Sequence, residues 1–263
     1  MDLINPSPSL PLPKTMWLVL RARTLADDLS LVAPDELGAP SASGHVKAAE
    51  RALNELGIYG LPADDLLRAR QSYSAFTDAL RSAALAQSGE EPSTLRAALE
   101  WLMKQSPTQP ITSTNFESLD PERVFQGSAR WNGFTYWASE LGFAEHAWAV
   151  GQSEDALVAN PVRAIVSVMK GTRGLGLRSD AIPVRQFLDR LQTAMPVFPL
   201  SVGDTGTDPL GRAASWALVG AHARGWIRLE MKADAARVYL TDPDAPAGKR
   251  AVSHVVLGVD GDE

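Results

Sequence analysis

The chain has 263 residues, which exceeds the usual size of one domain and predicts two or three small domains or one larger helical array. Hydrophobic residues make up 45% of it and charged residues 21%, a composition typical of globular proteins that excludes disordered, fibrous and membrane-spanning classes. The net charge of -6 has the wrong sign for a protein that coats nucleic acid non-specifically, although a local basic face is compatible with it.

The chain contains no cysteine, which excludes a disulfide framework, a thiol nucleophile, an iron–sulfur cluster and a zinc site built on thiolates. No early segment has the basic start and apolar run of a signal peptide. The longest apolar stretches, such as residues 16–20, are too short to span a bilayer. We therefore expect a cytoplasmic protein that makes no membrane contact.

Residues 1–90 are predicted to form a first, winged-helix-like module. Four prolines between residues 5 and 13 oppose both helix and sheet, so this stretch is predicted to be an extended lead-in. Short helices are expected over residues 14–23 and 26–31, the second closed by the Ala33-Pro34 step.

The next helix of this module is predicted to end at Gly57. Its apolar residues recur at helical spacing and are Val46, Ala49, Leu53 and Leu56. Residues 58–61 are predicted to be a short strand and residues 63–87 a longer helical stretch. Three helices followed by a strand is the order of a helix-turn-helix unit with a hairpin appended.

Residues 91–200 are predicted to form a central, helical, winged-helix-like module. Caps, apolar stripes and stop signals predict helices over residues 93–102, 113–119, 128–141, 160–170 and 183–195. On the third of these, Trp131, Phe134 and Trp137 share one face, which predicts that they are core residues.

Residues 201–263 are predicted to form a C-terminal winged helix, with a helix over residues 209–224 that Gly225 ends. A strand follows whose predicted buried positions are Ile227, Leu229 and Met231. Residues 237–240 are expected to return as the second strand of the hairpin, and residues 252–257 can supply a further strand. The expected fold class is therefore mainly α with small β-hairpins, built from tandem winged-helix-like modules.

The sequence contains no recognisable catalytic or metal-binding motif. The histidines are not spaced as helical metal ligands and are His45, His146, His222 and His254. His254 is predicted to be a half-buried strand residue whose ring forms a hydrogen bond. The glycine-rich residues 171–176 match neither a P-loop nor a dinucleotide fingerprint and are expected to connect two helices. These observations predict a protein that is not an enzyme and holds no cofactor or metal.

Basic side chains are concentrated in one part of the chain. Between residues 160 and 195, six Lys and Arg face two Asp, a local balance of +4 in a chain of -6. The candidate DNA contacts are three cations of this segment and three of the predicted hairpin, namely Lys170, Arg173, Arg178, Arg228, Lys232 and Arg237. In the alternative, these side chains form a solvated face with salt bridges, and the hairpin cations pair with Glu230 and Asp234.

The sequence Arg-Trp-Asn-Gly-Phe at residues 130–134, with the aromatic and apolar positions that follow up to Phe143, resembles the central motif of the DpdG family. These proteins accompany bacterial clusters that place 7-deazaguanine derivatives in DNA and restrict unmodified DNA. Residues 225–230 and 249–255 also fit the family, so the resemblance covers about the last two thirds of the chain, from about residue 95. It implies a non-catalytic component of an anti-phage or restriction assembly that works beside helicase and nuclease partners.

Two functions remain open from the sequence. The first is a non-catalytic DNA-binding or adaptor subunit of a bacterial anti-phage DNA modification and restriction system, with double-stranded DNA as a partner. The second is a purely protein-binding scaffold that recruits helicase and nuclease partners without touching DNA. The dependence of DNA affinity on salt separates them, because only a phosphate-binding surface loses affinity as salt rises.

Overall fold

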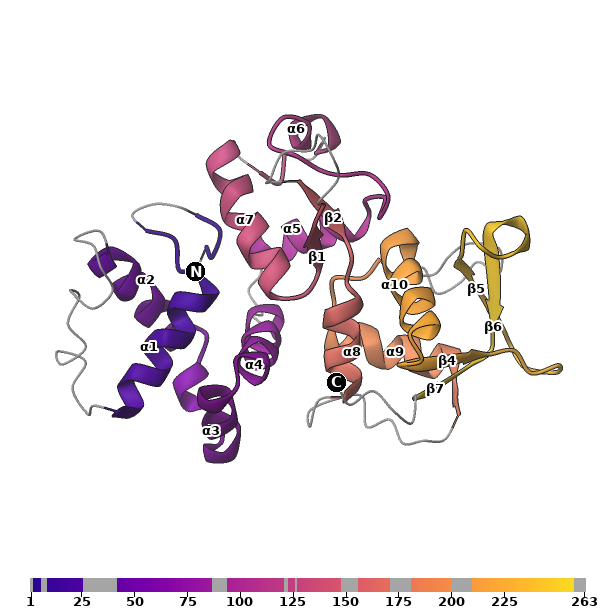
Figure 1. Cartoon of the computed structure of the whole chain (residues 1–263), viewed down its shortest axis with the longest axis horizontal. Helices are drawn as coiled ribbons and strands as arrows, with labels where there is room; N and C mark the ends of the chain where they lie inside the picture. Colours follow the sequence, from indigo (N-terminus) through magenta and orange to yellow (C-terminus); the bar gives the residue numbers. More distant parts are fainter. Residues whose placement is uncertain are drawn as a thin grey trace. The chain divides into compact units, whose positions relative to one another are not determined.

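The computed structural model describes residues 2–5, 9–25, 42–86, 94–120, 123–125, 127–147, 156–170, 181–199 and 210–257 (Figure 1). The fold is mainly helical with small antiparallel sheets, which confirms the expected fold class at this level. No helix within the described ranges is long and apolar enough to cross a bilayer.

The chain folds as two compact units, and each is described by itself. The first comprises Met1–Ala98 and Ser113–Leu141, and the second comprises Leu99–Thr112 and Gly142–Glu263. The finer division into three modules, with boundaries after residues 90 and 200, stays a prediction.

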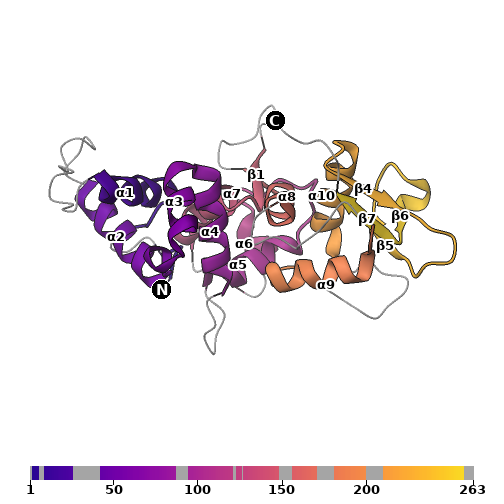
Figure 2. The same ribbon diagram turned by 90° about the horizontal axis from the view of Figure 1, so that it is seen from below.

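The first unit is built from helices. They are α1 (Pro13–Leu25), α2 (Ala42–Glu55), the 3-10 helix η3 (Ile58–Gly60), α3 (Ala63–Gln71), α4 (Tyr73–Ala86), the start of α5 (Thr94–Met103), α6 (Phe116–Leu119) and α7 (Ser128–Glu140). Helix α1 packs chiefly against α2, and α3 packs against α4 (Figure 2).

The strand expected over residues 58–61 is wrong. Gly57 ends α2 as predicted, in a left-handed conformation with φ of 66°, but the chain then turns at once. The N–H of Gly60 donates to the carbonyl of Gly57 at 3.0 Å, which closes a 3-10 turn. A short apolar run predicts burial, here of Ile58, but it does not supply a neighbouring strand to pair with.

The long helical stretch expected over residues 63–87 is two helices separated by Ser72. Ser72 has extended backbone angles, φ -127° and ψ 124°, so α3 ends before it. Its hydroxyl oxygen accepts a hydrogen bond from the N–H of Ala75 at 3.3 Å, which is the geometry of a helix N-cap. Ser72 therefore ends one helix and starts the next.

The aromatic face of α7 forms the core of the first unit, as predicted. Trp131, Phe134 and Trp137 are fully buried. Phe116 stacks on Trp131 with ring centroids 5.1 Å apart. The carboxylate of Asp120 accepts hydrogen bonds from the next turn's backbone, including one from the N–H of Phe125 at 2.9 Å, and so holds the Phe125 ring against this cluster.

Replacing Trp137 with Ala should lower the free energy of unfolding by about 3–5 kcal/mol, because the substitution leaves a cavity in a well-packed core. Chemical denaturation of the purified protein measures this difference. Tyr136, the preceding residue on α7, is 55% exposed, so Tyr136→Ala is the matched control and should change stability by less than about 0.5 kcal/mol. Equal stability of the two variants would contradict a structural role for Trp137.

The N-terminal segment crosses α7 at Gly133. Leu3 and Ile4 are buried, and the carboxylate of Asp2 lies 2.9 Å from the guanidinium of Arg130. A Cβ at position 133 would lie 2.7 Å from the carbonyl oxygen of Ile4. Glycine at this helical position is thus required by a close approach of backbone to helix, a role that helical periodicity alone does not reveal.

Gly133→Ala should destabilise the protein by about 1–3 kcal/mol, because the added methyl group meets backbone rather than a side chain that can rotate away. Gly60→Ala serves as the control, since no atom lies within 4 Å of a Cβ built at that position. Thermal unfolding of both variants tests the difference. A Gly133→Ala variant as stable as the control would show that residues 2–5 do not pack on α7 as the structure places them.

In its described residues, the second unit combines helices with three small sheets. Its elements, besides the end of α5, are β1 (Ala144–His146), β2 (Leu157–Ala159), α8 (Val162–Lys170), β3 (Ile182–Pro183), α9 (Val184–Ala194), α10 (Gly211–Ala223), β4 (Ile227–Glu230), β5 (Val238–Thr241), the 3-10 helix η4 (Pro246–Gly248), β6 (Lys249–Val252) and β7 (His254–Leu257). The sheets pair β1 with β2, β5 with β6, and β3, β7 and β4 in that order, all antiparallel.

The predicted hairpin between residues 227–231 and 237–240 is wrong in its pairing. Strand β4 pairs with β7, and β5 pairs with β6. Ile227 and Leu229 are buried as expected, but Met231 is 43% exposed, because β4 ends at Glu230. Alternation of apolar residues identifies a strand and its buried face. The choice of the strand with which it pairs is set by contacts between residues that are distant in sequence.

Ser253 marks the point where the chain passes from the β5–β6 sheet to the β3–β7–β4 sheet. Its N–H donates to the carbonyl of Glu230 at 2.8 Å, and its hydroxyl oxygen accepts from the N–H of Lys232 at 2.9 Å. Its carbonyl accepts from the N–H of Val184, the first residue of α9, at 2.8 Å. The hydroxyl also lies 2.9 Å from Nδ1 of His254, which confirms the prediction that this half-buried ring forms a hydrogen bond.

Candidate nucleic-acid interface

Basic side chains outnumber acidic ones over residues 161–257, in contrast to the rest of the chain. Residues 161–257 contain thirteen Lys and Arg against eight Asp and Glu, whereas residues 1–160 contain twelve against twenty. The net charge of -6 therefore hides a basic C-terminal part, which is the distribution that a phosphate-binding surface requires.

Helix α10 leads directly into strand β4 and presents a narrow exposed stripe. The exposed side chains on this helix are those of Arg212, Trp216 and Ala223. The opposite face is buried and consists chiefly of small residues, Ala213, Ala214, Ala217 and Ala221, together with Leu218. Small side chains let the helix lie close to its neighbours, and α10 contacts α8, β4 and β5.

The three predicted hairpin cations differ in their surroundings. Arg228 is exposed, and its Nε lies 2.7 Å from a carboxylate oxygen of Glu230, so it forms the ion pair that the alternative interpretation expected. Arg237 lies over the ring of Tyr239, with its guanidinium carbon 5.8 Å from the ring centroid. Lys232 is exposed, and no acidic side chain of the described residues forms an ion pair with it.

The structure describes one of the three candidate DNA contacts predicted in the basic segment 160–195. Lys170 is exposed on the last turn of α8. Arg173 and Arg178 lie outside the residues that the structure describes. Their prediction as DNA contacts therefore stays a prediction.

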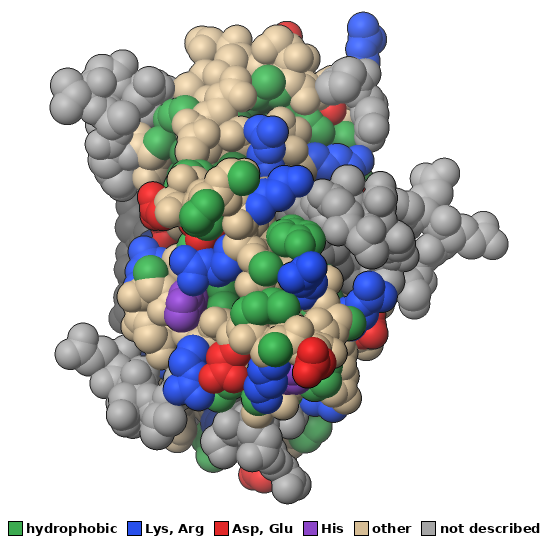
Figure 3. All heavy atoms as spheres, turned by 90° about the vertical axis from the view of Figure 1, so that its right-hand side faces the viewer, with side chains coloured by type: hydrophobic (Ala, Val, Ile, Leu, Met, Phe, Trp, Pro, Cys, Tyr) green, Lys and Arg blue, Asp and Glu red, His purple; other side chains and the backbone are tan. Residues whose placement is uncertain are grey.

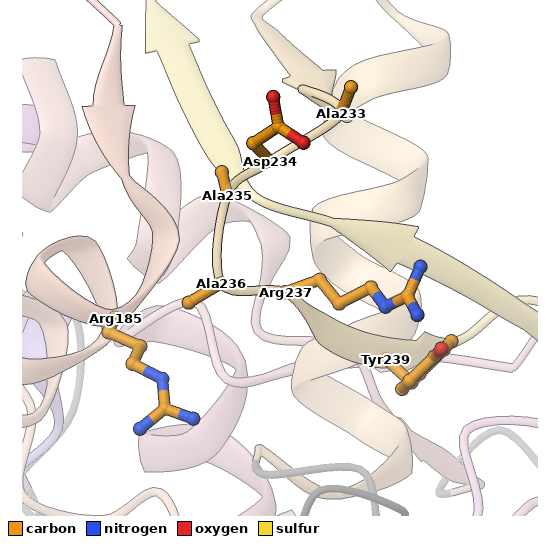
Figure 4. A pocket seen from close by; sticks show the side chains of 7 residues that line it. All are labelled: Arg185, Ala233, Asp234, Ala235, Ala236, Arg237 and Tyr239. Atoms are coloured by element: carbon orange, nitrogen blue, oxygen red, sulfur yellow. The ribbon is translucent and has the colours of Figure 1, made fainter.

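A hollow of about 560 Å³ lies between the start of α9 and the turn that joins β4 to β5. Its lining residues are Arg185, Ala233, Asp234, Ala235, Ala236, Arg237 and Tyr239 (Figure 4). Figure 4 shows the side chains of Arg185 and Arg237 on opposite sides of Ala236, with Arg237 extending over Tyr239. The carboxylate of Asp234 lies away from both guanidinium groups.

Arg185 belongs to the basic segment 160–195 but is not among the contacts predicted from the sequence. It is exposed, and no acidic side chain in the described ranges forms an ion pair with it. Strands β3 and β4 lie on either side of β7 in one sheet. Because Arg185 follows β3 directly, this sheet brings it close to the turn that follows β4. No sequence pattern near Arg185 indicates this pairing, since the strand that connects the two segments is about seventy residues further along the chain.

The β5–β6 hairpin adds a second row of polar and basic side chains. Arg237, Tyr239 and Thr241 alternate along one face, and Lys249 is the cross-strand partner of Thr241. Leu240 and Val252, on the opposite face, are fully buried. Figure 3, which views the side of the molecule that bears β5 and β6, shows Lys and Arg side chains among hydrophobic ones, with fewer acidic side chains.

An ion pair between a buried carboxylate and a half-buried arginine fixes the end of this hairpin. The carboxylate of Asp242 is fully buried and lies 2.6 Å from Nε of Arg250. Its other oxygen accepts a hydrogen bond from the N–H of Asp244 at 3.0 Å. Because removal of Arg250 would leave the buried carboxylate of Asp242 without its cation, the pair holds residues 242–250 in one arrangement.

The described residues hold no group of three His, Asp or Glu side chains placed to bind a metal ion. The hollow and the outer face of the β5–β6 hairpin thus place basic side chains beside the ring of Tyr239.

Comparison with known proteins identifies the family. A family model described as DpdG-like matches residues 1–235, which is most of the chain. The match includes the Arg-Trp-Asn-Gly-Phe motif at residues 130–134 and the passage at residues 225–230, but it ends before residues 249–255, and it extends further toward the N-terminus than expected. No curated protein and no solved structure matches the chain. The extent of the family match shows that this chain belongs to the DpdG-like family.

Proposed function

We propose that the elements from α8 to β7 form a winged helix that binds double-stranded DNA. In this proposal the chain is a non-catalytic DNA-binding or adaptor subunit of a bacterial anti-phage DNA modification and restriction system, and it acts in the cytoplasm. The observation that carries the proposal is the sheet order β3–β7–β4 in the basic part of the chain.

The order of elements supports a winged helix. Helix α8, strand β3, helices α9 and α10, and strands β4 and β7 follow one another, and the last strand lies between the other two. This is a helix-turn-helix unit followed by a wing, with the β5–β6 hairpin inserted in the wing. The connection from α9 to α10 spans residues 195–210 and is longer than the usual turn of such a unit.

The proposed winged helix places α10 as the helix that enters the major groove. The N-terminal residues of a recognition helix contact the DNA, and Arg212 is the second residue of α10. Lys232 and Arg237 lie on the turn after β4, where a wing reaches the neighbouring backbone. The proposed winged helix includes α8 and α9, which lie before residue 200, so it extends across the domain boundary expected after that residue.

Membership of the DpdG-like family associates the chain with Dpd-type systems. Such a system has to act on DNA, so a subunit that holds DNA beside helicase and nuclease partners has a defined place in it. The proposal assigns no catalytic step, cofactor or metal to this chain.

Duplex DNA affinity should fall steeply as salt rises. With contacts from Arg212, Lys232 and Arg237, the slope of log Kobs against log salt should be about -3 or steeper, at about -0.9 for each phosphate neutralised. Fluorescence anisotropy of a labelled duplex over a salt series measures it. Absence of binding at low salt would overturn the DNA-binding proposal in favour of a scaffold.

The hairpin cations should contribute unequally. Lys232→Gln and Arg237→Gln should each lower the salt slope by about one, without changing sequence preference, since each removes one phosphate contact. Arg228→Gln should lower it less, because Arg228 is paired with Glu230. Arg51→Gln, on α2 of the first unit, is the control and should leave the slope unchanged.

A combined Arg228→Glu, Lys232→Glu, Arg237→Glu variant that folds and keeps full duplex affinity would contradict the role of the wing. The basic segment around Lys170, Arg173 and Arg178 would then be the next surface to test.

A protein-binding scaffold is the second candidate, and exposed apolar side chains favour it. Trp216 on α10 is 36% exposed and Met231 after β4 is 43% exposed. Large apolar side chains at the surface are typical anchors of protein interfaces. In this case the same winged helix would hold a partner protein, and Trp216→Ala would weaken that complex while salt would have little effect.

A further inference from the structure

The hollow beside α9 combines two arginines that come from distant parts of the chain. Arg185 lies on the first turn of α9, and Arg237 lies at the end of the β4–β5 turn. Neither forms an ion pair with an acidic side chain of the described residues, and Asp234 lies away from both. Two guanidinium groups without carboxylate partners at the edge of one hollow favour an anionic ligand, and phosphate matches their fork geometry.

The hollow is larger than a phosphate group needs. Its volume of about 560 Å³ lies within the range of sites that take whole small molecules. Its wall includes the half-buried ring of Tyr239, on whose face the guanidinium of Arg237 lies. Phosphate-binding groups next to an accessible aromatic ring are the two parts of a site for a nucleotide, because the ring can stack on the base.

The ring of Tyr239 is held on a rigid hairpin and is not covered by its cross-strand neighbour. Its partner in β6 is Ala251, whose methyl group is too small to shield the ring. Thr241 and Lys249 continue the same face beyond Tyr239, and the ion pair of the buried Asp242 with Arg250 fixes the turn that follows. A nucleic-acid strand that leaves the hollow along this face of the hairpin would therefore pass a further basic residue, Lys249.

We propose that this hollow binds a nucleotide whose base is unpaired, within or at the end of a single-stranded segment of DNA. Tyr239 stacks on the base with the ring face opposite to the one on which Arg237 lies, and Arg185 and Arg237 hold the adjoining phosphates. In a duplex the faces of each base are covered by its neighbours, so the ring of Tyr239 selects single-stranded DNA. The inference rests on the proposed function and deepens it, since it adds a site for an unpaired nucleotide beside the duplex-binding surface, with Arg237 at the border of the two.

The test compares binding of a labelled oligothymidylate with binding of a labelled duplex of the same length, by fluorescence anisotropy at fixed salt. Tyr239→Ala should weaken oligothymidylate binding by about tenfold or more, the loss expected for one base–aromatic stack, and should change duplex binding by less than about twofold. Tyr239→Phe should keep full affinity, because the stacking ring remains. Tyr136→Ala, which removes an exposed tyrosine of the first unit, is the matched control and should bind both probes normally.

The phosphate contact of Arg185 is tested through the dependence of oligothymidylate affinity on salt. Arg185→Gln should lower the salt slope for oligothymidylate by about 0.7, the value for one phosphate of a single strand. Arg51→Gln is again the control. Melting temperatures of all variants establish that they fold. If Tyr239→Ala unfolds, Tyr239→Leu replaces it, because leucine keeps apolar volume without an aromatic ring. Tyr239→Leu should lose the same affinity for oligothymidylate.

The outcomes separate the inference from the proposed function. Loss of oligothymidylate binding in Tyr239→Ala and Arg185→Gln, with duplex binding retained, supports the inference. Unchanged oligothymidylate binding in both variants, or a wild-type protein that binds duplex alone, overturns the inference and leaves the proposed function standing. A wild-type protein that binds neither probe overturns both.

Discussion

The hydrogen bonds of Ser253 join the segments on which the candidate site is built. This buried residue accepts from the N–H of Val184, so it fixes the start of α9, and it accepts from the N–H of Lys232, so it fixes the start of the β4–β5 turn. Arg185 follows Val184 by one residue, and the turn begins at Lys232. Hydrogen bonds to the hydroxyl and the carbonyl of Ser253 therefore hold both walls of the hollow. Because Ser253 is buried, water does not compete for these bonds.

This connection depends on a change of sheet. Residues 249–257 run as nearly continuous strand, but β6 pairs with β5 and β7 pairs with β3 and β4. The change occurs at Ser253, because there the N–H bonds to the carbonyl of Glu230 at the end of β4 instead of continuing the β5 ladder. The inserted β5–β6 hairpin can then project from the β3–β7–β4 sheet with its own basic face while its inner face packs on α10.

Helices were predictable from the sequence to a degree that strands were not. The apolar stripes and end signals of α2, α7 and α8 identify their helices closely, because the contacts and caps that define a helix lie within a few residues of one another. The pairing of β4 with β7 joins segments that lie about twenty-five residues apart, and the local alternation of Ile227 and Leu229 is compatible with either partner. Local pattern therefore indicated the nearer partner, β5, which is the wrong one.

The candidate site shows the same limit. Arg237 and Lys232 were predicted from their place on a hairpin, and they do lie on the β4–β5 turn even though the pairing of the strands differs. Arg185 and Tyr239 are not among the predicted contacts, because the β3–β7–β4 sheet brings the start of α9 to the β4–β5 turn, which spacing in the sequence does not indicate. Gly133 is a comparable case in the first unit, since only the crossing of residues 2–5 explains it.

The composition of α10 bears on how DNA would be read. Base edges in the major groove are recognised by side chains with several donors or acceptors, such as Arg, Lys, Asn and Gln. The exposed side chains of α10 offer one of these, Arg212, beside Trp216 and Ala223. His222 faces inward instead, with Nδ1 3.4 Å from the N–H of Leu229. Under the proposed function, a helix with so few groups for base edges would discriminate weakly among duplex sequences, so contacts with phosphates and with unpaired bases, both independent of sequence, would supply most of the affinity.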